Sequence, residues 1–517
     1  MLKLGIDVGG TNTDATILND KDQVIATVKT HTTADIETGI YDAIKKVLLD
    51  FSIDPTEISQ AMLGTTQATN AIVERKNLAT VGVIRIGYPA TASVMPYTEW
   101  PQDMIAALTG KAALVHGGYE FNGDPIVNFD PAEIYDILNS WKGKIESLAI
   151  IGVFSALNDD QEQKTAQLAK KVLGADIPIS LSSRIGTIGL IQRENATILN
   201  AALVKVIKRV TKGFAAALAD YGITQATSYL CQNDGTLMSL EFATKYPILT
   251  IGSGPTNSIR GAAYLSNLQD AMVLDIGGTT SDIGVLTNGF PRESSRAITV
   301  GGIKTSFRMP DVLSIGLGGG SVIHKDAQGK ITVGPDSVGY KITDEAICFG
   351  GQTITATDIA VKLLGVKLGN PQLTEQIDDD LAKKAMAIIQ ARLSDAIDQM
   401  KTNAVKVDLI LVGGGSIIVA SALAGVAKIY SNKYGKVANA IGATIAQVGG
   451  QYEKIYQYAN LDRRIALADA AELAKKQAIV AGADPKTIKI IEVNEVPLAY
   501  APGETTRVKV KVVGELA

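Results

Sequence analysis

Two short segments, far apart in the chain, carry the same pattern of carboxylates, glycines and hydroxyls. The first is Asp7-Val8-Gly9-Gly10-Thr11-Asn12-Thr13-Asp14, and the second is Asp275-Ile276-Gly277-Gly278-Thr279-Thr280-Ser281-Asp282. Paired glycines let the backbone turn tightly and approach a ligand closely, and the hydroxyl and N–H groups of such a turn can bind an anion. A carboxylate at the end of the preceding strand, Asp7 or Asp275, suits Mg²⁺, which prefers oxygen ligands and keeps several waters. The repeat predicts two loops that bind phosphate and its cation, the alternative being a hairpin turn without a ligand.

The residues on either side of each copy predict a β-hairpin. Each copy follows a short apolar strand and leads into another apolar run, Ala15 to Leu18 or Ile283 to Leu286. The chain has no Gly-x-x-x-x-Gly-Lys-Ser/Thr sequence and no Gly-x-Gly-x-x-Gly opening its first helix, which excludes Walker-type and dinucleotide-binding loops. Two facing hairpins instead predict a nucleotide held in a cleft between two lobes.

The elements that position these loops follow an α/β pattern. Short apolar runs alternate with segments of helical period, which indicates a sheet covered by helices. The expected buried strands are Leu148 to Val153, Ile248 to Ile251, Ala271 to Ile276 and Val407 to Val412. The expected helices include Ile40 to Leu48, Leu199 to Val210, Arg463 to Ala481 and, as the longest, Thr374 to Met400. Two C-terminal strands are expected at Thr487 to Val493 and Thr506 to Val513.

Composition and charge narrow the range of partners. Of the 517 residues, 46% are hydrophobic and 20% are charged, as in ordinary globular proteins, and the formal net charge is -4. Because there is no basic surplus to neutralise a phosphate backbone, we expect no nucleic-acid partner. The two cysteines, Cys231 and Cys348, suit a reducing, cytoplasmic location. The first residues contain no signal-peptide core, so the mature protein is expected to begin at residue 1.

One uncharged segment, Leu409 to Ala427, is long enough to be considered as a membrane span. Gly413-Gly414-Gly415 lies within it, and each glycine costs a helix about 1 kcal/mol relative to alanine. We therefore expect a strand at Val407 to Val412, a glycine turn, a helix at Ile417 to Ala427, and no membrane partner.

The two repeated segments resemble the phosphate motifs of the actin, Hsp70 and sugar-kinase superfamily. Leu411-Val412-Gly413-Gly414-Gly415-Ser416 is similar to the adenosine motif of that superfamily, with an ordinary strand-to-helix turn as the alternative. Two small-residue segments, Gly261-Ala262-Ala263 and Ala438 to Ala443, are similar to its crossing helices. The resemblance implies an α/β fold of duplicated actin-like, ribonuclease H-like lobes with a nucleotide cleft between them. The expected parts are an N-terminal lobe at residues 1–180, a second lobe at 181–450, and a short C-terminal helix and strands at 451–517.

Further segments resemble the hydantoinase A and 5-oxoprolinase family. The N-terminal signature of this family is similar to Gly64-Thr65-Thr66-Gln67-Ala68-Thr69-Asn70-Ala71-Ile72-Val73-Glu74-Arg75, and four more segments match: Arg193 to Ala201, Gln232 to Ser239, Ser253 to Pro255 and Gly318 to Ser321. The resemblance implies ATP-dependent opening of a cyclic amide or imide ring, although some relatives activate small ketones for carboxylation. ATP is needed because amide resonance, which imposes a rotation barrier of about 18 to 20 kcal/mol, makes the carbonyl carbon a poor electrophile.

The resemblance also implies roles for individual residues. Asp7 and Asp275 would organise Mg²⁺, Asp14 or Asp282 would orient water, and these four carboxylates are the predicted catalytic residues. The residues predicted to bind ATP are Gly9, Gly10, Thr11, Asn12, Thr13, Gly277, Gly278, Thr279, Thr280, Ser281, Gly413, Gly414, Gly415 and Ser416. The residues predicted to contact the substrate are Thr65, Thr66, Asn70, Arg75, Arg193, Asn233 and Asp311. Helix capping by Thr and Asn and structural ion pairing by Arg are the alternatives.

The chain departs from the family pattern at three places. Leu63 stands where many relatives have His, Asp311-Val312-Leu313 replaces an Asp-x-His, and Asp344 to Gly350 lacks both prolines of the family segment. These differences leave open the ring substrate and any metal at those positions. Many family members act with a second polypeptide, so we expect a small cyclic amide substrate and either a second hydantoinase-type subunit or a homo-oligomer.

Two other functions fit the same cleft. One is a regulatory ATPase that opens and closes around a protein partner, and the other is a small-molecule kinase. A metal-dependent cyclic amidohydrolase is disfavoured, because the three histidines, His31, His116 and His324, form no H-x-H or H-E-x-x-H pair.

Overall fold

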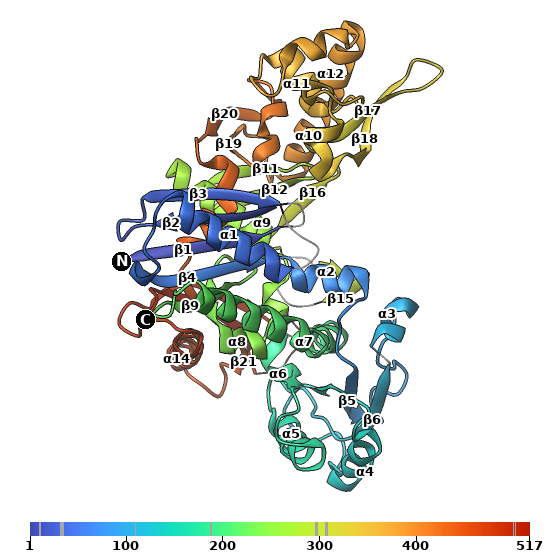
Figure 1. The fold of residues 1–517 in the computed structure, drawn as a ribbon. Coiled ribbons are helices and arrows are strands. Elements are labelled where there is room, and N and C mark those ends of the chain that lie inside the picture. Colours follow the sequence, from blue (N-terminus) through green and yellow to red (C-terminus); the bar gives the residue numbers. More distant parts are fainter. Residues whose placement is uncertain are drawn as a thin grey trace.

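The computed structural model describes residues 1–9, 12–31, 36–108, 110–186, 189–294, 298–305, 309–499, 501 and 503–517. Within these residues the protein is a mixed α/β structure with two large sheets and a separate four-stranded sheet. The second large sheet and its helices lie at one end of the molecule, the four-stranded sheet lies at the other, and the first large sheet lies between them (Figure 1).

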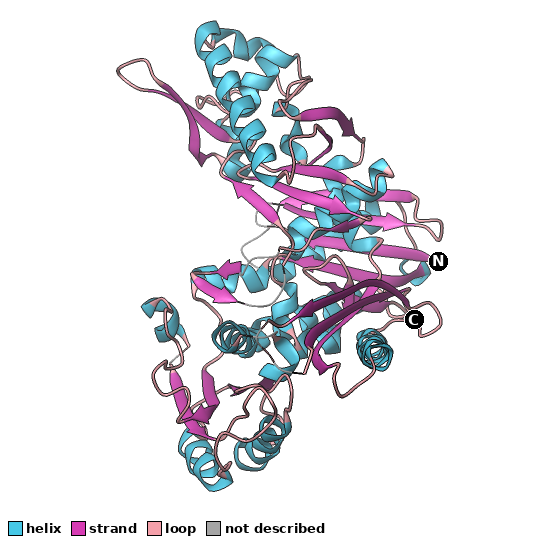
Figure 2. Ribbon diagram, turned by 180° about the vertical axis from the view of Figure 1, so that it is seen from behind, coloured by secondary structure: helices cyan, strands magenta, loops and turns pink. Residues whose placement is uncertain are grey.

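The first large sheet has nine strands in the order β22-β23-β21-β10-β9-β4-β1-β2-β3. Their bounds are β1 Leu2–Val8, β2 Asn12–Leu18, β3 Val24–His31, β4 Ile58–Thr65, β9 Thr227–Cys231, β10 Leu237–Ser239, β21 Val448–Gln457, β22 Lys489–Pro497 and β23 Thr505–Gly514. Its core includes apolar side chains from α1 (Ile36–Asp50) and α7 (Leu190–Asp220). The buried alanines of α14 (Arg463–Ala481) pack against β21 and β23. The chain therefore places its N- and C-terminal strands in one sheet, and both termini lie on one side of the molecule (Figure 2).

The second large sheet has the order β13-β12-β11-β19-β20, with β16 paired to β12. Its strands are β11 Ala271–Ile276, β12 Ser281–Thr287, β13 Phe290–Pro291, β16 Val312–Ile315, β19 Val407–Val412 and β20 Val426–Ser431. Apolar side chains from α11 (Ala356–Leu364) and α12 (Asp379–Met400) join these strands in one core.

The two large sheets repeat one topology. In each, three antiparallel strands (β1-β2-β3 or β11-β12-β13) are followed by two strands parallel to the first (β4 and β9, or β19 and β20). The predicted hairpins occupy the same place in both sheets. Asp7 stands opposite Asp14 in one ladder, and Asp275 stands opposite Asp282 in the other. The predicted duplication of an actin-like α/β unit is therefore confirmed.

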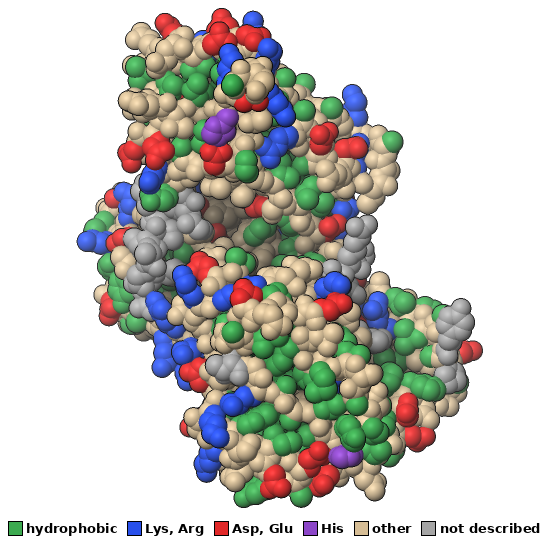
Figure 3. All heavy atoms as spheres, turned by 90° about the vertical axis from the view of Figure 1, so that its right-hand side faces the viewer, with side chains coloured by type: hydrophobic (Ala, Val, Ile, Leu, Met, Phe, Trp, Pro, Cys, Tyr) green, Lys and Arg blue, Asp and Glu red, His purple; other side chains and the backbone are tan. Residues whose placement is uncertain are grey.

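Two helices made of small residues cross between the lobes, as predicted. They are α9 (Ser253–Ser266) and α13 (Ala438–Thr444), and they pack against each other. A Cβ atom at Gly261 would lie 1.9 Å from the carbonyl oxygen of Ala438, and one at Gly442 would lie 1.9 Å from that of Asn257. Only glycine allows this backbone contact. The surface of the molecule is hollowed between the two lobes (Figure 3).

The remaining elements surround these two units. The four-stranded parallel sheet has the order β6-β5-β7-β8. Its strands are β5 Val81–Tyr88, β6 Lys111–His116, β7 Ser147–Gly152 and β8 Ile179–Leu181. Two hairpins are β14 Ile298–Val300 with β15 Ile303–Thr305, and β17 Ser321–Lys325 with β18 Ile331–Ser337. The other helices are α2 Gln67–Glu74, α3 Gln102–Ala107, α4 Pro131–Trp141, α5 Asp160–Leu173, α6 Ser182–Ile185, α8 Leu240–Lys245 and α10 Ile342–Glu345. Among the helices so described, none is long and apolar enough to cross a membrane.

Three predictions about secondary structure were wrong. Residues Pro247–Thr250 form a 3₁₀-helix in place of a strand, because Pro247 lacks the N–H that a strand ladder needs and fixes φ near a helical value. The segment after Val412 forms a short 3₁₀-helix, Gly414–Ile418, and then leads to β20, which begins at Val426, so the expected helix at 417–427 is not formed. The longest described helix is α7, whereas 374–400 is divided between a 3₁₀-helix (Pro371–Gln376) and α12. The division into parts at residues 180 and 450 stays a prediction.

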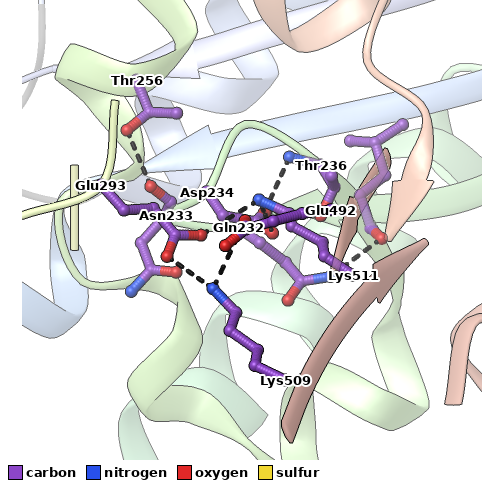
Figure 4. A network of polar contacts seen from close by, with 10 residues as sticks. Gln232, Asn233, Asp234, Thr236, Thr256, Glu293, Glu492, Lys509 and Lys511 are labelled. Carbon is purple, nitrogen blue, oxygen red and sulfur yellow. Dashed lines mark hydrogen bonds and ion pairs between the residues drawn. The ribbon is translucent and has the colours of Figure 1, made fainter. Parts of the chain in front are cut away.

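A buried ion network joins the last strand to the second lobe (Figure 4). Lys509 and Lys511 of β23 are 0% and 4% exposed. The ammonium group of Lys511 lies 2.9 Å from a carboxylate oxygen of Asp234 and 3.3 Å from one of Glu293. Lys509 lies 2.7 Å from the other oxygen of Glu293. Because β21 pairs with β10 through a single residue pair, this network is a further link between the C-terminal strands and the rest of the chain.

We expect Lys511→Met to lower the free energy of unfolding by about 3 kcal/mol, because it removes the buried ammonium group that neutralises the partly buried carboxylates of Asp234 and Glu293. Lys384→Met, which breaks a surface pair with Asp380, serves as the control and should cost less than about 1 kcal/mol. Urea unfolding followed by circular dichroism measures both. Equal losses in the two variants would contradict a structural role for the buried network.

Candidate functional site

A cavity of about 480 Å³ opens between the two hairpins. Both predicted carboxylate pairs line it, Asp7 with Asp14 from the first lobe and Asp275 with Asp282 from the second. Residues 413–415, the turn after β19, form another part of the wall. The structure thus brings together three segments that are separated by most of the chain.

The first carboxylate pair is fixed by amide groups from the crossing helices. Asp7 is 3% exposed and accepts hydrogen bonds from Asn257 of α9 (3.0 Å) and Asn439 of α13 (2.9 Å). The same amide nitrogen of Asn439 lies 3.0 Å from Asp14, which also pairs with Lys29 of β3 at 2.5 Å. Burial raises the pKa of Asp7 to about 6, and the nearby charge of Asp14 adds to the effect. Both carboxylates are therefore held in place through the helix crossing.

The second pair is fixed by hydroxyl groups. Ser258, the residue after Asn257 in α9, donates to Asp275, and Ser314 of β16 donates to Asp282. Burial raises the pKa of Asp275 to about 6, partly opposed by the hydrogen bond from Ser258. Burial also raises the pKa of Asp282. Successive residues of one helix thus contact the equivalent carboxylates of the two lobes.

A glycine lies against the first carboxylate of each hairpin, Asp7 or Asp275, and leaves room for it. Gly64 lies beside Asp7 in the ladder, and a Cβ atom there would come within 2.1 Å of the Asp7 carboxylate. At Gly413, which follows β19, a Cβ atom would come within 2.3 Å of the Asp275 carboxylate. Gly413 also has φ +84, a conformation that favours glycine. The close approach of each carboxylate explains why a glycine is needed at positions 64 and 413.

The Gly318 to Ser321 segment supports the second hairpin from outside. The N–H of Gly319 donates to the carbonyl of Gly277 (3.0 Å), and the N–H of Gly320 donates to that of Gly278 (2.7 Å). The Thr357 hydroxyl, at the start of α11, donates to the carbonyl of Gly319 (2.9 Å). The hairpin is therefore connected rigidly to α11.

The charge of the lining decides what the cavity can bind. Its described carboxylates are the four aspartates, and its described basic side chains are Lys29 and Lys436. At neutral pH the carboxylates are in excess, so a bare polyphosphate would be repelled, whereas one neutralised by divalent cations fits. The described residues contain no group of three or more His, Cys, Asp or Glu arranged to hold a metal.

Most of the residues predicted to bind ATP line this cavity: Gly9, Asn12, Gly277, Gly278, Thr279, Thr280, Gly413, Gly414 and Gly415. Thr13, Ser281 and Ser416 are not among the lining residues. Thr13 and Ser281 are fully buried, and the hydroxyl of Ser281 donates to the carbonyl of Leu317 (2.6 Å). Gly10 and Thr11 lie outside the described residues. The side chains of Thr13 and Ser281 are therefore buried in the protein and do not line the cavity.

The N-terminal family signature reaches the cavity through one residue. Thr66, which precedes α2, lines the wall, and the amide of Asn70 contacts its hydroxyl at 3.4 Å. Thr65 is buried at the end of β4 and accepts from the N–H of Gln67. Arg75 turns away, donating to Asp103 (3.2 Å) and to the carbonyl of Gly301 (2.8 Å).

The other three substrate candidates do not line this cavity. Arg193 is 3% exposed and donates to the carbonyl of Gly152 (2.7 Å). Asp311 forms an ion pair with Arg292 (2.6 Å). Asn233 lines a second cavity of about 430 Å³ beside the buried ion network. The carbonyl oxygen of Asn233 accepts a hydrogen bond from the hydroxyl of Thr256, the residue before Asn257, and so helps to hold α9 in position.

The residues at the site that the sequence did not single out include Lys29, Asn257, Ser258 and Asn439. Asn439 is the polar residue within the small-residue segment Ala438 to Ala443, and that contrast was an available signal. The others lie in segments of ordinary composition and become recognisable only through their contacts. His116 and His324 pair with Glu133 and Asp336 at the surface, away from the cavity lining.

Comparison with known proteins agrees with this architecture. The family "Hydantoinase/oxoprolinase N-terminal region" matches residues 3–173, and "Hydantoinase/oxoprolinase" matches residues 193–406. An uncharacterised protein of Methanocaldococcus jannaschii is 25% identical over 430 residues, covering 77% of this chain and 62% of that protein. Caprolactamase subunit alpha of Pseudomonas jessenii is 25% identical over 382 residues, which cover 70% of this chain and 54% of that protein. The chain thus spans less than two thirds of either relative.

A solved structure shows the same fold. The crystal structure of ATP-dependent caprolactamase from Pseudomonas jessenii superposes with a TM-score of 0.80 at 18% identity, covering 100% of this chain and 88% of that one. Together with the two family matches and the duplicated sheets, this places the chain in the hydantoinase/oxoprolinase family, with an actin-like fold.

Proposed function

We propose that the protein is an ATP-dependent hydrolase that opens a cyclic amide or imide ring, working in the cytoplasm where ATP is available. The observation that supports this most directly is the convergence of two equivalent carboxylate hairpins on one cavity. The family supplies the reaction class, and the name caprolactamase, borne by a relative, supplies an example of a ring amide.

The cavity walls suit Mg·ATP. Asp7 and Asp275 face the cavity from equivalent positions and would hold Mg²⁺, directly or through water. The backbone N–H groups of the two hairpins would take phosphate oxygens, since glycine turns present such donors without side-chain obstruction. Bound Mg·ATP would supply the phosphoryl group that activates the ring carbonyl oxygen. The protein's part is then positioning and charge neutralisation, as is usual in phosphoryl transfer.

The second carboxylate of one hairpin, Asp14 or Asp282, would orient the attacking water. Asp14 is oriented by Lys29 and Asn439, and Asp282 by Ser314. Raised pKa values make both carboxylates better proton acceptors than exposed aspartates. The ring amide would lie where Thr66, Gly254 and Pro255 line the cavity, beside the N-terminal ends of α2 and α9.

The protein is proposed to work within an assembly. Its relative is named as the alpha subunit of caprolactamase, which indicates at least one further kind of subunit in that enzyme. A second hydantoinase-type subunit is therefore the proposed partner, with a homo-oligomer as the alternative.

Phosphate release from Mg·ATP should depend on a cyclic amide. With caprolactam, 5-oxoproline, hydantoin, a sugar and a ketone tested in parallel, we expect release with a cyclic amide alone, accompanied by ring opening detected by mass spectrometry. Asp7→Ala should reduce turnover by about 100-fold or more, because it removes a charge positioned for the reaction. The exposed Asp20→Ala is the control and should retain activity. A stable phosphorylated product would instead indicate a kinase, and release indifferent to every small molecule would indicate a regulatory ATPase.

Asp275→Asn should stabilise the nucleotide-free protein. The folded-state pKa of about 6 lies above the ordinary value of 3.8, so ionisation costs the folded state free energy as the pH rises from about 4 to 6, and the cost persists above pH 6. Asparagine removes this charge and can still accept from Ser258. The free energy of unfolding at pH 7 should rise by at most about 3 kcal/mol, because the pKa of Asp275 is raised from 3.8 to about 6 and each pKa unit corresponds to about 1.36 kcal/mol. Thermal unfolding at pH 7 and pH 4 tests this, and an equal gain at both values would contradict it.

A further inference from the structure

A second cavity, of about 430 Å³, takes no part in the proposed reaction. Its described lining residues are all different from those of the cavity between the hairpins. They come from α6, α8, the 3₁₀-helix Pro247–Thr250, β21 and α14, so elements from the middle and the end of the chain enclose it together. Binding sites for small molecules commonly have about this volume. This cavity can therefore hold a ligand of its own.

One part of the second cavity is apolar. The rings of Phe242 in α8 and of Tyr246, the residue after that helix, pack with 4.6 Å between their centroids. Tyr452 of β21 adds a further aromatic side chain. The other apolar side chains of the lining are Ile185, Ile248, Leu249, Met309, Leu473 and Val480. An apolar or aromatic body placed here would release water from both surfaces, which is favourable.

Basic side chains stand beside these rings. Burial raises the pKa of Tyr246, and the positive charges of Arg184 and Lys245 oppose that increase, so both groups lie near the phenol. Lys476 of α14 is the third basic residue of the described lining. Within the described ranges, the Tyr246 hydroxyl has no hydrogen-bond partner. It is therefore available, together with the three basic groups, to a polar group of a ligand.

The carboxylates of the described lining are already paired with basic groups that lie outside it. The pairs are Asp234 with Lys511 (2.9 Å), Glu293 with Lys509 (2.7 Å) and Glu453 with Arg507 (3.8 Å). The lysines of the first two pairs (Figure 4) are 4% and 0% exposed. A cationic ligand would compete with these buried ammonium groups for the carboxylates. Separating a buried ion pair is costly, so the cavity does not favour a cation.

The basic groups of the lining have weaker partners. Arg184 lies 3.2 Å from Asp159. Lys245 lies 2.7 Å from Glu241, and both pairs are open to solvent. Exposed ion pairs contribute little to stability, so a ligand can displace them at small cost. Lys476 forms no ion pair with a carboxylate in the part of the chain that the structure describes. The cavity therefore favours an anion over a cation.

We infer that the second cavity is a binding site for a small amphipathic carboxylate. The apolar body of the ligand lies against Phe242 and Tyr246. Its carboxylate lies among Arg184, Lys245 and Lys476, and arginine can bind such a group through two parallel hydrogen bonds. A phosphate ester fits less well, because a doubly charged head costs more to remove from water beside apolar walls. The inference does not depend on the proposed function, since the two cavities are separate.

Three probes with the same body and different heads test this inference. They are 6-phenylhexanoate, 6-phenylhexanamide and 6-phenylhexylamine, and calorimetry measures their binding to the full chain without nucleotide at pH 7. We expect the carboxylate to bind about 10-fold more tightly than the neutral amide, because hydrogen bonds between charged groups are the stronger ones. The amine should bind more weakly than the amide, because its head would lie among like charges.

Two variants locate the bound carboxylate. The double variant Arg184→Gln, Lys245→Gln should bind 6-phenylhexanoate about 10-fold more weakly and the amide within about twofold of the unaltered protein, because only charged contacts are lost. Leu473→Trp adds volume to the lining and should weaken both probes by about 10-fold or more. Lys205→Gln is the control, because it breaks an exposed ion pair outside both cavities. Since the double variant changes exposed side chains, it keeps the test decisive if the bulky variant fails to fold.

The inference is wrong if none of the probes binds, if all three bind equally, or if the amine binds more tightly than the carboxylate. Unchanged binding of the carboxylate to the double variant would also contradict it. So would displacement of the carboxylate by Mg·ATP, which would place the probe between the hairpins. Failure of the proposed function shows instead in phosphate release, which none of these measurements includes.

Discussion

The site depends on the direct backbone contact between α9 and α13. Gly261 and Gly442 let the two helices cross with each carbonyl almost touching the partner's Cα, and no other residue fits there. At that spacing Asn257, Ser258 and Asn439 reach carboxylates that belong to different lobes. Side chains at the crossing would push the helices apart and withdraw these donors. The two halves of the duplicated fold therefore act as one site only because their connection contains so little side-chain volume.

The carboxylates are kept buried at an energetic cost that the surroundings only partly offset. Asp7 has two amide donors and Asp275 has one hydroxyl, yet burial still raises both pKa values to about 6. Gly64 and Gly413 give the carboxylates room but no hydrogen-bonding side chain. A protein optimised for stability alone would place apolar or neutral residues there. In the proposed function this cost is what keeps the two carboxylates available to a cation.

The sequence predicted the features that are repeated or compositionally unusual. The hairpins, their strand pairing and the crossing helices follow from duplicated motifs and from runs of small residues. Of the residues predicted to contact the substrate, Thr66 lines the cavity, whereas Arg75, Arg193 and Asp311 bond to other groups of the protein. An arginine or aspartate in a motif gives no information about which group it will contact.

Other features depend on tertiary contacts that no local pattern encodes. Lys29 contacts Asp14 across the β2–β3 pair, and Ser258 is one ordinary residue in a helix. The prediction of a strand at Ile248 to Ile251 from its apolar residues was also wrong, because Pro247 lacks an N–H group and the segment Pro247–Thr250 forms a 3₁₀-helix.

The strand order of the two large sheets has a consequence for how the chain is made. All strands of the second sheet lie between residues 271 and 431, whereas the first sheet combines residues 2–65 and 227–239 with 448–514. Contacts between segments so distant in sequence form slowly, because a long loop must close before they gain any stability. During synthesis the second lobe can complete its strands while the first still has an open, unpaired edge. An unpaired strand edge can pair with another chain, so newly made molecules are exposed to mispairing with one another until the C-terminal strands are added.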